Sequence, residues 1–263
     1  MVFDIRDGNL TYKHIVDERP LAERENFREH FHTDYELLYF LHGDAEFIIE
    51  QNSYRLRPHS LLVIKPGEHH NLVVKSDNKY YERMVLRFNS ADVPESVDRL
   101  LQGLASVYDI AGTRLSELFF QLDTHCEQIE GPLITELLKS ARMEILIYLC
   151  CRRNTVQKAE FVNEYIGQII AFIDRNLVAI RSLDNIAASL HLSRSTINRL
   201  FYAQVNVPVM SYVRTKKCML AHSMLLSGLS PTIVSERCGF NDYSSFYRAY
   251  LKVFRHAPSE DAR

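Results

Sequence analysis

The sequence lacks the features that mark secreted, membrane and metal-scaffold proteins. Its 263 residues contain five cysteines whose spacing matches no metal-binding motif: positions 126, 150, 151, 218 and 238. The longest unbroken apolar run, Ile145–Cys151, is far shorter than the roughly 20 residues that a membrane-spanning helix needs. An odd number of cysteines without a signal peptide predicts reduced thiols and a cytoplasmic protein.

The chain as a whole also lacks an excess of charge of one sign. Lysine and arginine total 31, and aspartate and glutamate total 33. The distribution is uneven, because residues 160–263 carry a balance of +4 and the preceding residues a balance of −6. A mildly basic C-terminal part beside an acidic N-terminal part is typical of a DNA reader joined to a domain that does not touch DNA.

Residues 182–201 have the pattern of a helix-turn-helix. An apolar stripe at helical spacing (Leu183, Ile186, Leu190) precedes Ser193, which is a good N-cap for a second helix. The inward face of that helix would be Ile197, Leu200 and Phe201. Its polar residues would then point outward, where arginine can pair with guanine, asparagine with adenine and hydroxyls with phosphates. These predicted DNA contacts are Arg194, Ser195, Thr196, Asn198 and Arg199.

Residues 230–250 repeat this pattern. Ile233, Val234 and Cys238 are expected inward, Gly239 at the turn, and Phe246 and Tyr250 as inner anchors of a second recognition helix. Asp242 or Ser244 could cap that helix. The residues left available to DNA are Asn241, Tyr243, Ser245, Tyr247 and Arg248.

The spacing of the two units favours DNA binding over two ordinary helical hairpins. A helix-like run, roughly 208–226, lies between them. Nineteen helical residues span about 28 Å, and successive major-groove faces of B-DNA lie about 34 Å apart. A rod of this length can set two recognition helices near that separation.

Residues 165–258 resemble the DNA-binding domain of AraC/XylS-type transcription regulators. The resemblance rests on the Ile-Ala and Leu-Ser positions within 186–201 and on Ala221 and Leu225-Leu226. It also rests on the run Cys238-Gly239-Phe240-Asn241-Asp242, on Phe246 and on Pro258. It implies two helix-turn-helix modules in adjacent major-groove segments. The sequence departs from the family where Asn206 and Arg255 replace glycines, and where Lys217 replaces the arginine of the linking helix.

Residues 1–91 have strand periodicity with turn residues at near-regular spacing, which predicts an antiparallel barrel or sandwich. The expected strands are 35–41, 45–50, 54–56, 61–64, 72–74 and 83–88.

One set of polar residues in this region shares a strand parity. His30, His32 and Glu36 would face one side, and His70 could join them after the Pro66-Gly67 turn. The spacing resembles the cupin signature. Three readings stay open: polar contacts to a small-molecule effector, which we favour, a divalent metal site, or interior polarity that stabilises the fold. Tyr39 and Arg87 are further candidates, and His69 is expected to face solvent.

Residues 92–159 are predicted to be helical. A long apolar stripe on the helix expected at 133–149 includes Ile134, Leu138, Ala141, Ile145 and Leu149. It could pack on its own barrel or on a second chain, and we favour dimerisation.

These patterns predict a two-domain α and β protein. An N-terminal cupin-like effector-sensing barrel (1–91) precedes a helical dimerisation or linker segment (92–159) and an all-α double helix-turn-helix domain (160–263). We expect a DNA-binding transcription regulator, an activator by family analogy, that needs no cofactor. The expected partners are double-stranded operator DNA, a small-molecule effector such as a sugar, a second copy of the chain, and RNA polymerase as a further candidate. The rival functions are a metal-dependent cupin enzyme with an accessory DNA domain and a structural DNA-binding protein whose barrel only dimerises.

Overall fold

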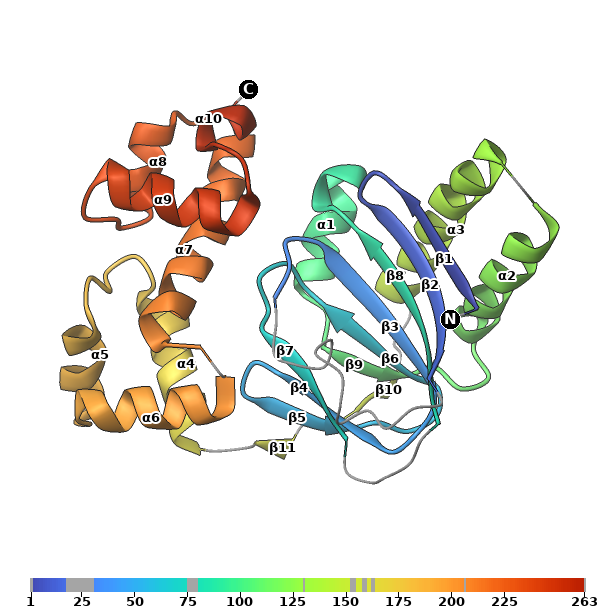
Figure 1. Ribbon diagram of the computed structural model, residues 1–263, viewed down its shortest axis with the longest axis horizontal. Helices are drawn as coiled ribbons and strands as arrows, with labels where there is room; N and C mark the ends of the chain where they lie inside the picture. Colours follow the sequence, from blue (N-terminus) through green and yellow to red (C-terminus); the bar gives the residue numbers. More distant parts are fainter. Residues whose placement is uncertain are drawn as a thin grey trace. The chain divides into compact units, whose positions relative to one another are not determined.

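The computed structural model describes residues 2–17, 31–74, 80–129, 131–151, 155–157, 160–161, 164–205 and 207–262. The chain divides into two compact units, Met1–Glu160 and Phe161–Arg263. The first is rich in strands and the second is helical (Figure 1). This confirms the two-part α and β architecture expected from the sequence. Among the described residues, no helix combines the length and the hydropathy needed to cross a membrane.

The strands of the first unit form two sheets, of order β1-β2-β8-β3-β6-β9-β10 and β11-β5-β4-β7. Every neighbouring pair from β1 to β10 is antiparallel. The strands are β1 (Phe3–Asp7), β2 (Leu10–Asp17), β3 (Tyr35–His42), β4 (Ala45–Ile49), β5 (Asn52–Arg55), β6 (Ser60–Ile64), β7 (His70–Val74), β8 (Tyr81–Phe88), β9 (Val107–Asp109), β10 (Thr155–Val156) and β11 (Glu160–Phe161).

Strand β3 is buried on both faces because the unit has two cores. Leu37 and Tyr39 belong to a core between the larger sheet and the helices. Leu38 and Phe40 point the other way, into a core shared by the two sheets. Side chains alternate along a strand, so Glu36 lies on the face of Leu38 and Phe40. A buried carboxylate therefore faces the space between the sheets.

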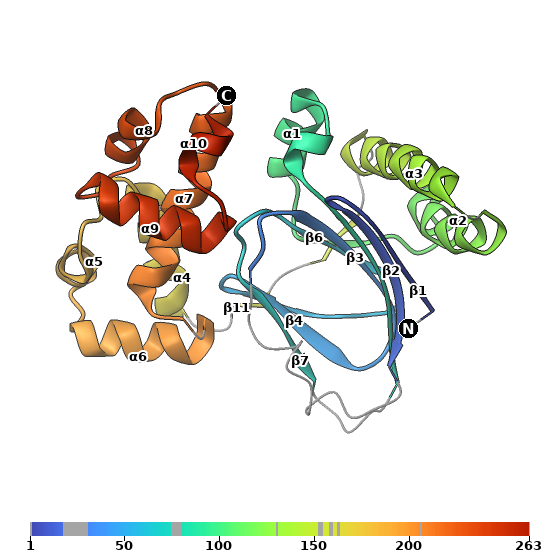
Figure 2. The same ribbon diagram turned by 45° about the horizontal axis from the view of Figure 1, so that its top comes forward.

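Three helices cover the outer face of the larger sheet: α1 (Glu95–Gln102), α2 (Arg114–Gln128) and α3 (Pro132–Cys151). Figure 2 shows α2 and α3 side by side next to β1 and β2. A short 3-10 helix, η3 (Ser90–Asp92), precedes α1.

The interpretation of the α3 stripe as a dimer surface is wrong. Ile134, Leu138, Ile145 and Leu149 are buried within the single chain, and Ala141 packs beside them in the same core. Helical periodicity identifies an apolar stripe but not the surface that covers it. Here the chain's own sheet and α2 cover it.

The second unit contains seven helices among its described residues. They are α4 (Glu164–Asn176), α5 (Leu183–Leu190), α6 (Arg194–Val205), α7 (Val209–Leu226), α8 (Pro231–Arg237), α9 (Tyr243–Phe254) and α10 (Pro258–Asp261). The first part of α7 packs with α4, α5 and α6 around one core. The last part of α7 packs with α8 and α9 around another. One continuous helix thus joins two helix-turn-helix modules.

The expected caps and turns of these modules are confirmed, with one exception among the inward residues. The Ser193 hydroxyl accepts a hydrogen bond from the Thr196 amide at 3.1 Å, and Asp242 accepts one from the Ser245 amide at 2.7 Å. Gly239 has a φ of 74°, which favours glycine. The exception is Ile233, which is expected inward but is exposed; α8 buries Val234, as expected, and also Ser235.

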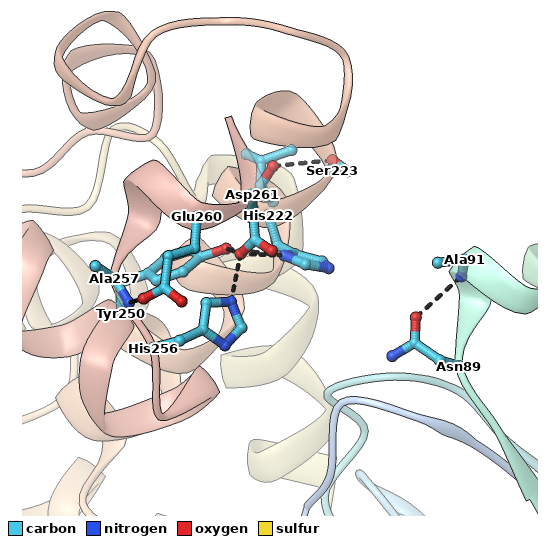
Figure 3. A network of polar contacts seen from close by, with 10 residues as sticks. Asn89, Ala91, His222, Ser223, Tyr250, His256, Ala257, Glu260 and Asp261 are labelled. Carbon is cyan, nitrogen blue, oxygen red and sulfur yellow. Dashed lines mark hydrogen bonds and ion pairs between the residues drawn. The ribbon is translucent and has the colours of Figure 1, made fainter. Parts of the chain in front are cut away.

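The end of the chain is held against the second module by one carboxylate. Asp261 accepts hydrogen bonds from the Tyr250 hydroxyl at 2.5 Å and from His256 Nε2 at 2.6 Å, and His222 Nδ1 lies 3.3 Å away (Figure 3). These partners come from α9, from the segment after it and from α7. The network therefore fixes α10 on both helices.

Candidate DNA-binding and effector-binding sites

Helix α6 has one apolar face, which is buried, and an opposite polar face, which is exposed. Ile197 and Phe201 are fully buried in the core of the first module. The predicted DNA contacts lie on the opposite side, where Thr196 is half-buried and the others are exposed: Arg194, Ser195, Asn198 and Arg199. At the start of the helix the Ser193 hydroxyl lies within 2.9 Å of the hydroxyls of both Ser195 and Thr196. The expected arrangement of a recognition helix is present.

The two arginines of this face differ in their surroundings. The guanidinium of Arg194 pairs through two nitrogens with the carboxylate of Asp184 on α5. Such a forked pair holds a guanidinium in one orientation. Arg199 makes no hydrogen bond or ion pair with another residue in the described part of the chain. Arg199 is therefore the better placed of the two for contact with a base, and the role of Asp184 could not be read from the sequence.

Helix α9 has the same two-sided construction. Phe246 and Tyr250 are fully buried, while Tyr243, Tyr247 and Arg248 are exposed. The Ser245 hydroxyl donates to Asp242 at 2.8 Å, so it is engaged in the cap. Asn241, just before the helix, is exposed.

In the first unit the structure brings together three of the four predicted effector residues. One ligand atom from each of His32, Glu36 and His70 lies within 4.8 Å of the others. Glu36 belongs to β3 of the larger sheet and His70 to β7 of the smaller one, so the cluster bridges the two sheets. A hydrogen bond of 2.8 Å from the Gly67 amide to the His32 carbonyl ties the Pro66–Gly67 turn to this segment. The fourth residue, His30, lies outside the described residues.

The hydrogen bonds of the two imidazoles define their tautomers. Nδ1 of His32 lies 2.7 Å from the Asp34 carbonyl oxygen, and Nδ1 of His70 lies 2.9 Å from that of Glu68. A carbonyl oxygen only accepts, so both Nδ1 atoms carry protons. The Nε2 atom of His32 lies 3.2 Å from the Glu36 carboxylate.

The cluster stabilises the ionised form of Glu36. Burial raises the pKa of this carboxyl, but His32, the Arg87 guanidinium and His70 outweigh burial and hold the pKa well below its usual value. Arg87 Nε donates to Glu36 at 2.7 Å. The Arg87 guanidinium and the ionised Glu36 carboxylate make a site suited to polar ligands.

The same donor set fits a divalent transition metal. Two imidazoles and one carboxylate are ordinary ligands for such an ion. In metal-bound histidines the N–H of the other ring nitrogen usually donates a hydrogen bond to a carbonyl or carboxylate, as Nδ1–H of both imidazoles does here. The pairing of Arg87 with Glu36 opposes a cation, because Arg87 already neutralises the carboxylate.

The structure also places three neighbouring residues for which the sequence gives an expectation. Arg87 reaches the cluster, as suggested. Tyr39 does not, because it lies on the opposite face of β3, where its hydroxyl is hydrogen-bonded with His59 and Ser116. His69 was expected to face solvent but is only 3% exposed and packs against the Phe31 ring. Strand parity misplaced it because it precedes β7 and is not part of that strand.

Two protein-family models match the chain. They are the AraC-like ligand binding domain, over residues 19–146, and a helix-turn-helix domain, over residues 186–263. The HTH-type transcriptional activator RhaS of Escherichia coli is 22% identical over 251 residues, and the alignment covers 92% of this chain and 89% of RhaS.

Among solved structures, the chain is similar to ToxT from Vibrio cholerae, with 14% sequence identity and a TM-score of 0.39. The alignment covers 96% of this chain and 97% of ToxT. Another is the C-terminal domain of the response regulator yesN from Fusobacterium nucleatum, at 20% identity with a TM-score of 0.36. It covers 38% of this chain and 100% of that domain.

Proposed function

The chain belongs to the AraC-type transcription regulators, and from this premise we propose that an effector bound between its two sheets controls how α6 and α9 read operator DNA. The observation that carries the proposal is the pair of capped recognition helices, each anchored by a buried apolar face and each exposing arginine and other polar side chains. Such a helix can enter the major groove and reach base edges.

Activation of transcription is the expected outcome of binding. The support comes from RhaS, a similar protein whose name describes a transcriptional activator. We further propose that the protein acts in the cytoplasm as a homodimer, contacts RNA polymerase and has no enzymatic activity. The dimer surface is not the α3 stripe, which the chain's own core occupies.

The effector site is proposed to be His32, Glu36 and His70, with His30 as a further contributor. Ionised Glu36 accepts hydrogen bonds, the Arg87 guanidinium donates them, and the histidines add polar ring nitrogens, which suits a ligand with several hydroxyls such as a sugar. Binding shifts the protein toward the conformational state that has the higher affinity for the effector. If this state also differs in its affinity for DNA, the effector and DNA change each other's affinity by the same factor.

A second candidate occupant is a divalent metal ion. It is favoured by the carbonyl-bound Nδ1 atoms of His32 and His70 and by the closeness of the three ligand atoms. Elemental analysis after gentle purification distinguishes the two, because a metal site predicts about one ion per chain.

The DNA arm of the proposal is tested by titrating operator duplex with Arg199→Ala. Loss of an arginine that reads a base should weaken binding by about 1–3 kcal/mol and relax specificity at that position. Arg99→Ala removes the same charge from an exposed position on α1 and should bind as wild type. Arg199→Ala binding like Arg99→Ala would move base reading away from α6.

The effector arm is tested with Glu36→Gln in a reporter assay and in thermal-shift titrations with monosaccharides and small organic acids. We expect loss of induction and of ligand-induced stabilisation, with DNA binding retained. Glu95→Gln, which changes an exposed carboxylate of the same unit, should respond as wild type. Normal induction by Glu36→Gln together with absence of metal would leave only a structural role for the cluster.

A further inference from the structure

The middle of α7 carries a lysine whose ammonium is inside the protein. Lys217 is 4% exposed. Its Nζ atom donates two hydrogen bonds of 2.6 Å, one to the carbonyl oxygen of Ile180 and one to that of Gly239. The ring of Phe240 lies 5.7 Å from the same nitrogen.

The two acceptors belong to different helix-turn-helix modules. Ile180 lies in the connection between α4 and α5 and is part of the first core. Gly239 lies in the turn between α8 and α9, beside the second core. Lys217 thus joins the first module, the linking helix and the second module at one point.

The backbones of the two modules also touch at this point. A Cβ atom on residue 239 would overlap the carbonyl oxygen of Val178, and it would lie 3.2 Å from Lys217 Nζ. Glycine is therefore required at 239 both for its φ of 74° and for this close approach. The contact leaves little room for the modules to rotate against each other.

Each module otherwise has a core of its own. The apolar residues that α7 gives to the first core end at Val213, and those that it gives to the second begin at Cys218. Without a link between the modules, bending of α7 would change the angle between α6 and α9. The Lys217 contacts lie where that bending would occur.

We propose that Lys217 is a positioning residue that fixes the angle between α6 and α9, so that one chain engages two successive major-groove segments as a rigid reader. This proposal rests on the proposed function, because it assumes that α6 and α9 both read DNA. Preorganisation of the two helices removes an ordering cost from binding and lets the second contact follow the first at high effective concentration.

The test uses the full-length protein and a duplex selected from random sequence by the wild type. A second duplex keeps the sequence block read by α6 and has the other block scrambled. The measured quantity is the dissociation constant for the scrambled duplex divided by that for the intact duplex. Lys217→Met should reduce this ratio about tenfold, mainly through weaker binding to the intact duplex. Lys217→Arg, which retains donors at this position, should restore most of it.

Lys216→Met is the matched control, because it removes a neighbouring lysine that lies over the Tyr212 ring on the same helix. It should keep the wild-type ratio, with at most a uniform loss of affinity for both duplexes. A folded Lys217→Met protein that keeps the wild-type ratio overturns the proposal. A wild type that selects no second block would instead contradict DNA reading by α9, so the two failures are distinguishable.

A pH titration of the wild type covers the case in which Lys217→Met does not fold. Burial, together with nearby Arg181, lowers the pKa of Lys217 to about 8, and Cys238 is the other titratable group that faces it. Above this pH its charge-assisted hydrogen bonds become weaker neutral ones. The ratio should therefore fall between pH 7 and pH 9 in the wild type but not in Lys217→Arg. Equal profiles for the two proteins overturn the proposal.

Discussion

Arg255 adopts a backbone conformation that favours glycine. It ends α9 with a φ of 67°, and its amide donates to the Leu251 carbonyl at 3.0 Å. The sequence departs from the family's glycine at this position, but the chain still makes the left-handed turn. The left-handed region costs a residue with a side chain about 1–2 kcal/mol.

Replacing Arg255 by glycine should therefore stabilise the helical unit. The relief of strain exceeds the extra freedom that glycine gives the unfolded chain, so we expect a net gain of about 0.5–1 kcal/mol. Calorimetry of the full-length protein measures the transition of this unit. Arg255→Ala keeps the strain and should show no gain. A glycine variant no more stable than the alanine variant would refute this account of the turn.

His14 links α2 to the larger sheet through two carboxylates. Its Nδ1 atom lies 2.7 Å from Asp123 and its Nε2 atom 2.9 Å from Glu82. The hydrogen bond with Asp123 is the main cause of a raised His14 pKa; burial opposes it, and Glu82 adds to it. A pKa raised by folding means that the stabilisation is complete below the unfolded value of about 6.5 and is lost as pH rises through the folded value.

His14→Gln should accordingly cost more stability at pH 6 than at pH 9. The measurement is the difference in free energy of unfolding between wild type and variant at each pH. The contribution of the other histidines to the pH dependence is the same in both proteins and cancels in this difference. A difference that does not change with pH would show that His14 is neutral in the folded protein.

At the scale of helices and strands, the sequence predicted elements with an apolar run or an apolar stripe. The strands β3 to β8, the linking helix α7 and the recognition helices follow from periodicity, turns and caps. Strand β2 was not predicted, because two of its buried positions are His14 and Asp17, which look like surface residues in a sequence. Strand β9 has only three residues between two helices, too few to show a period.

The candidate sites were predictable to a similar extent. Glu36 follows from strand parity and His70 from the turn before it, and the exposed residues of α6 follow from its buried stripe. His32 precedes β3, so strand parity does not account for its place in the cluster. The pairing of Arg194 with Asp184 and the hydrogen bonds of Lys217 to backbone carbonyls could not be predicted. Each depends on the packing of segments that are separated in sequence.

The α3 stripe gives a prediction opposite to that of a dimer interface. Leu138→Glu and Ile145→Glu place a charge in a closed core, so each should unfold or aggregate the first unit instead of producing a folded monomer. Ile147→Glu, on the same helix but 50% exposed, should remain folded. Circular dichroism with sedimentation velocity separates these outcomes. A folded Leu138→Glu monomer would restore the interface interpretation.

For the whole molecule, the central claim is that one chain reads DNA with two recognition helices. The second unit supplies two capped helices on separate cores, a single helix between them and a buried lysine that joins both modules. The first unit supplies a cluster of ionisable side chains between two sheets. If effector binding to the first unit and DNA binding by the second both depend on one equilibrium between two conformations, the effector controls DNA binding.

Selection of bound sequences from a random duplex library by the full-length protein tests this claim most directly. We predict enrichment of half-sites that each contain two sequence blocks whose centres lie about 10 base pairs apart, one turn of B-DNA. In the same selection, Arg199→Ala should lose sequence preference in only one block. Enrichment of a single block, or no enrichment above the starting library, would contradict the claim.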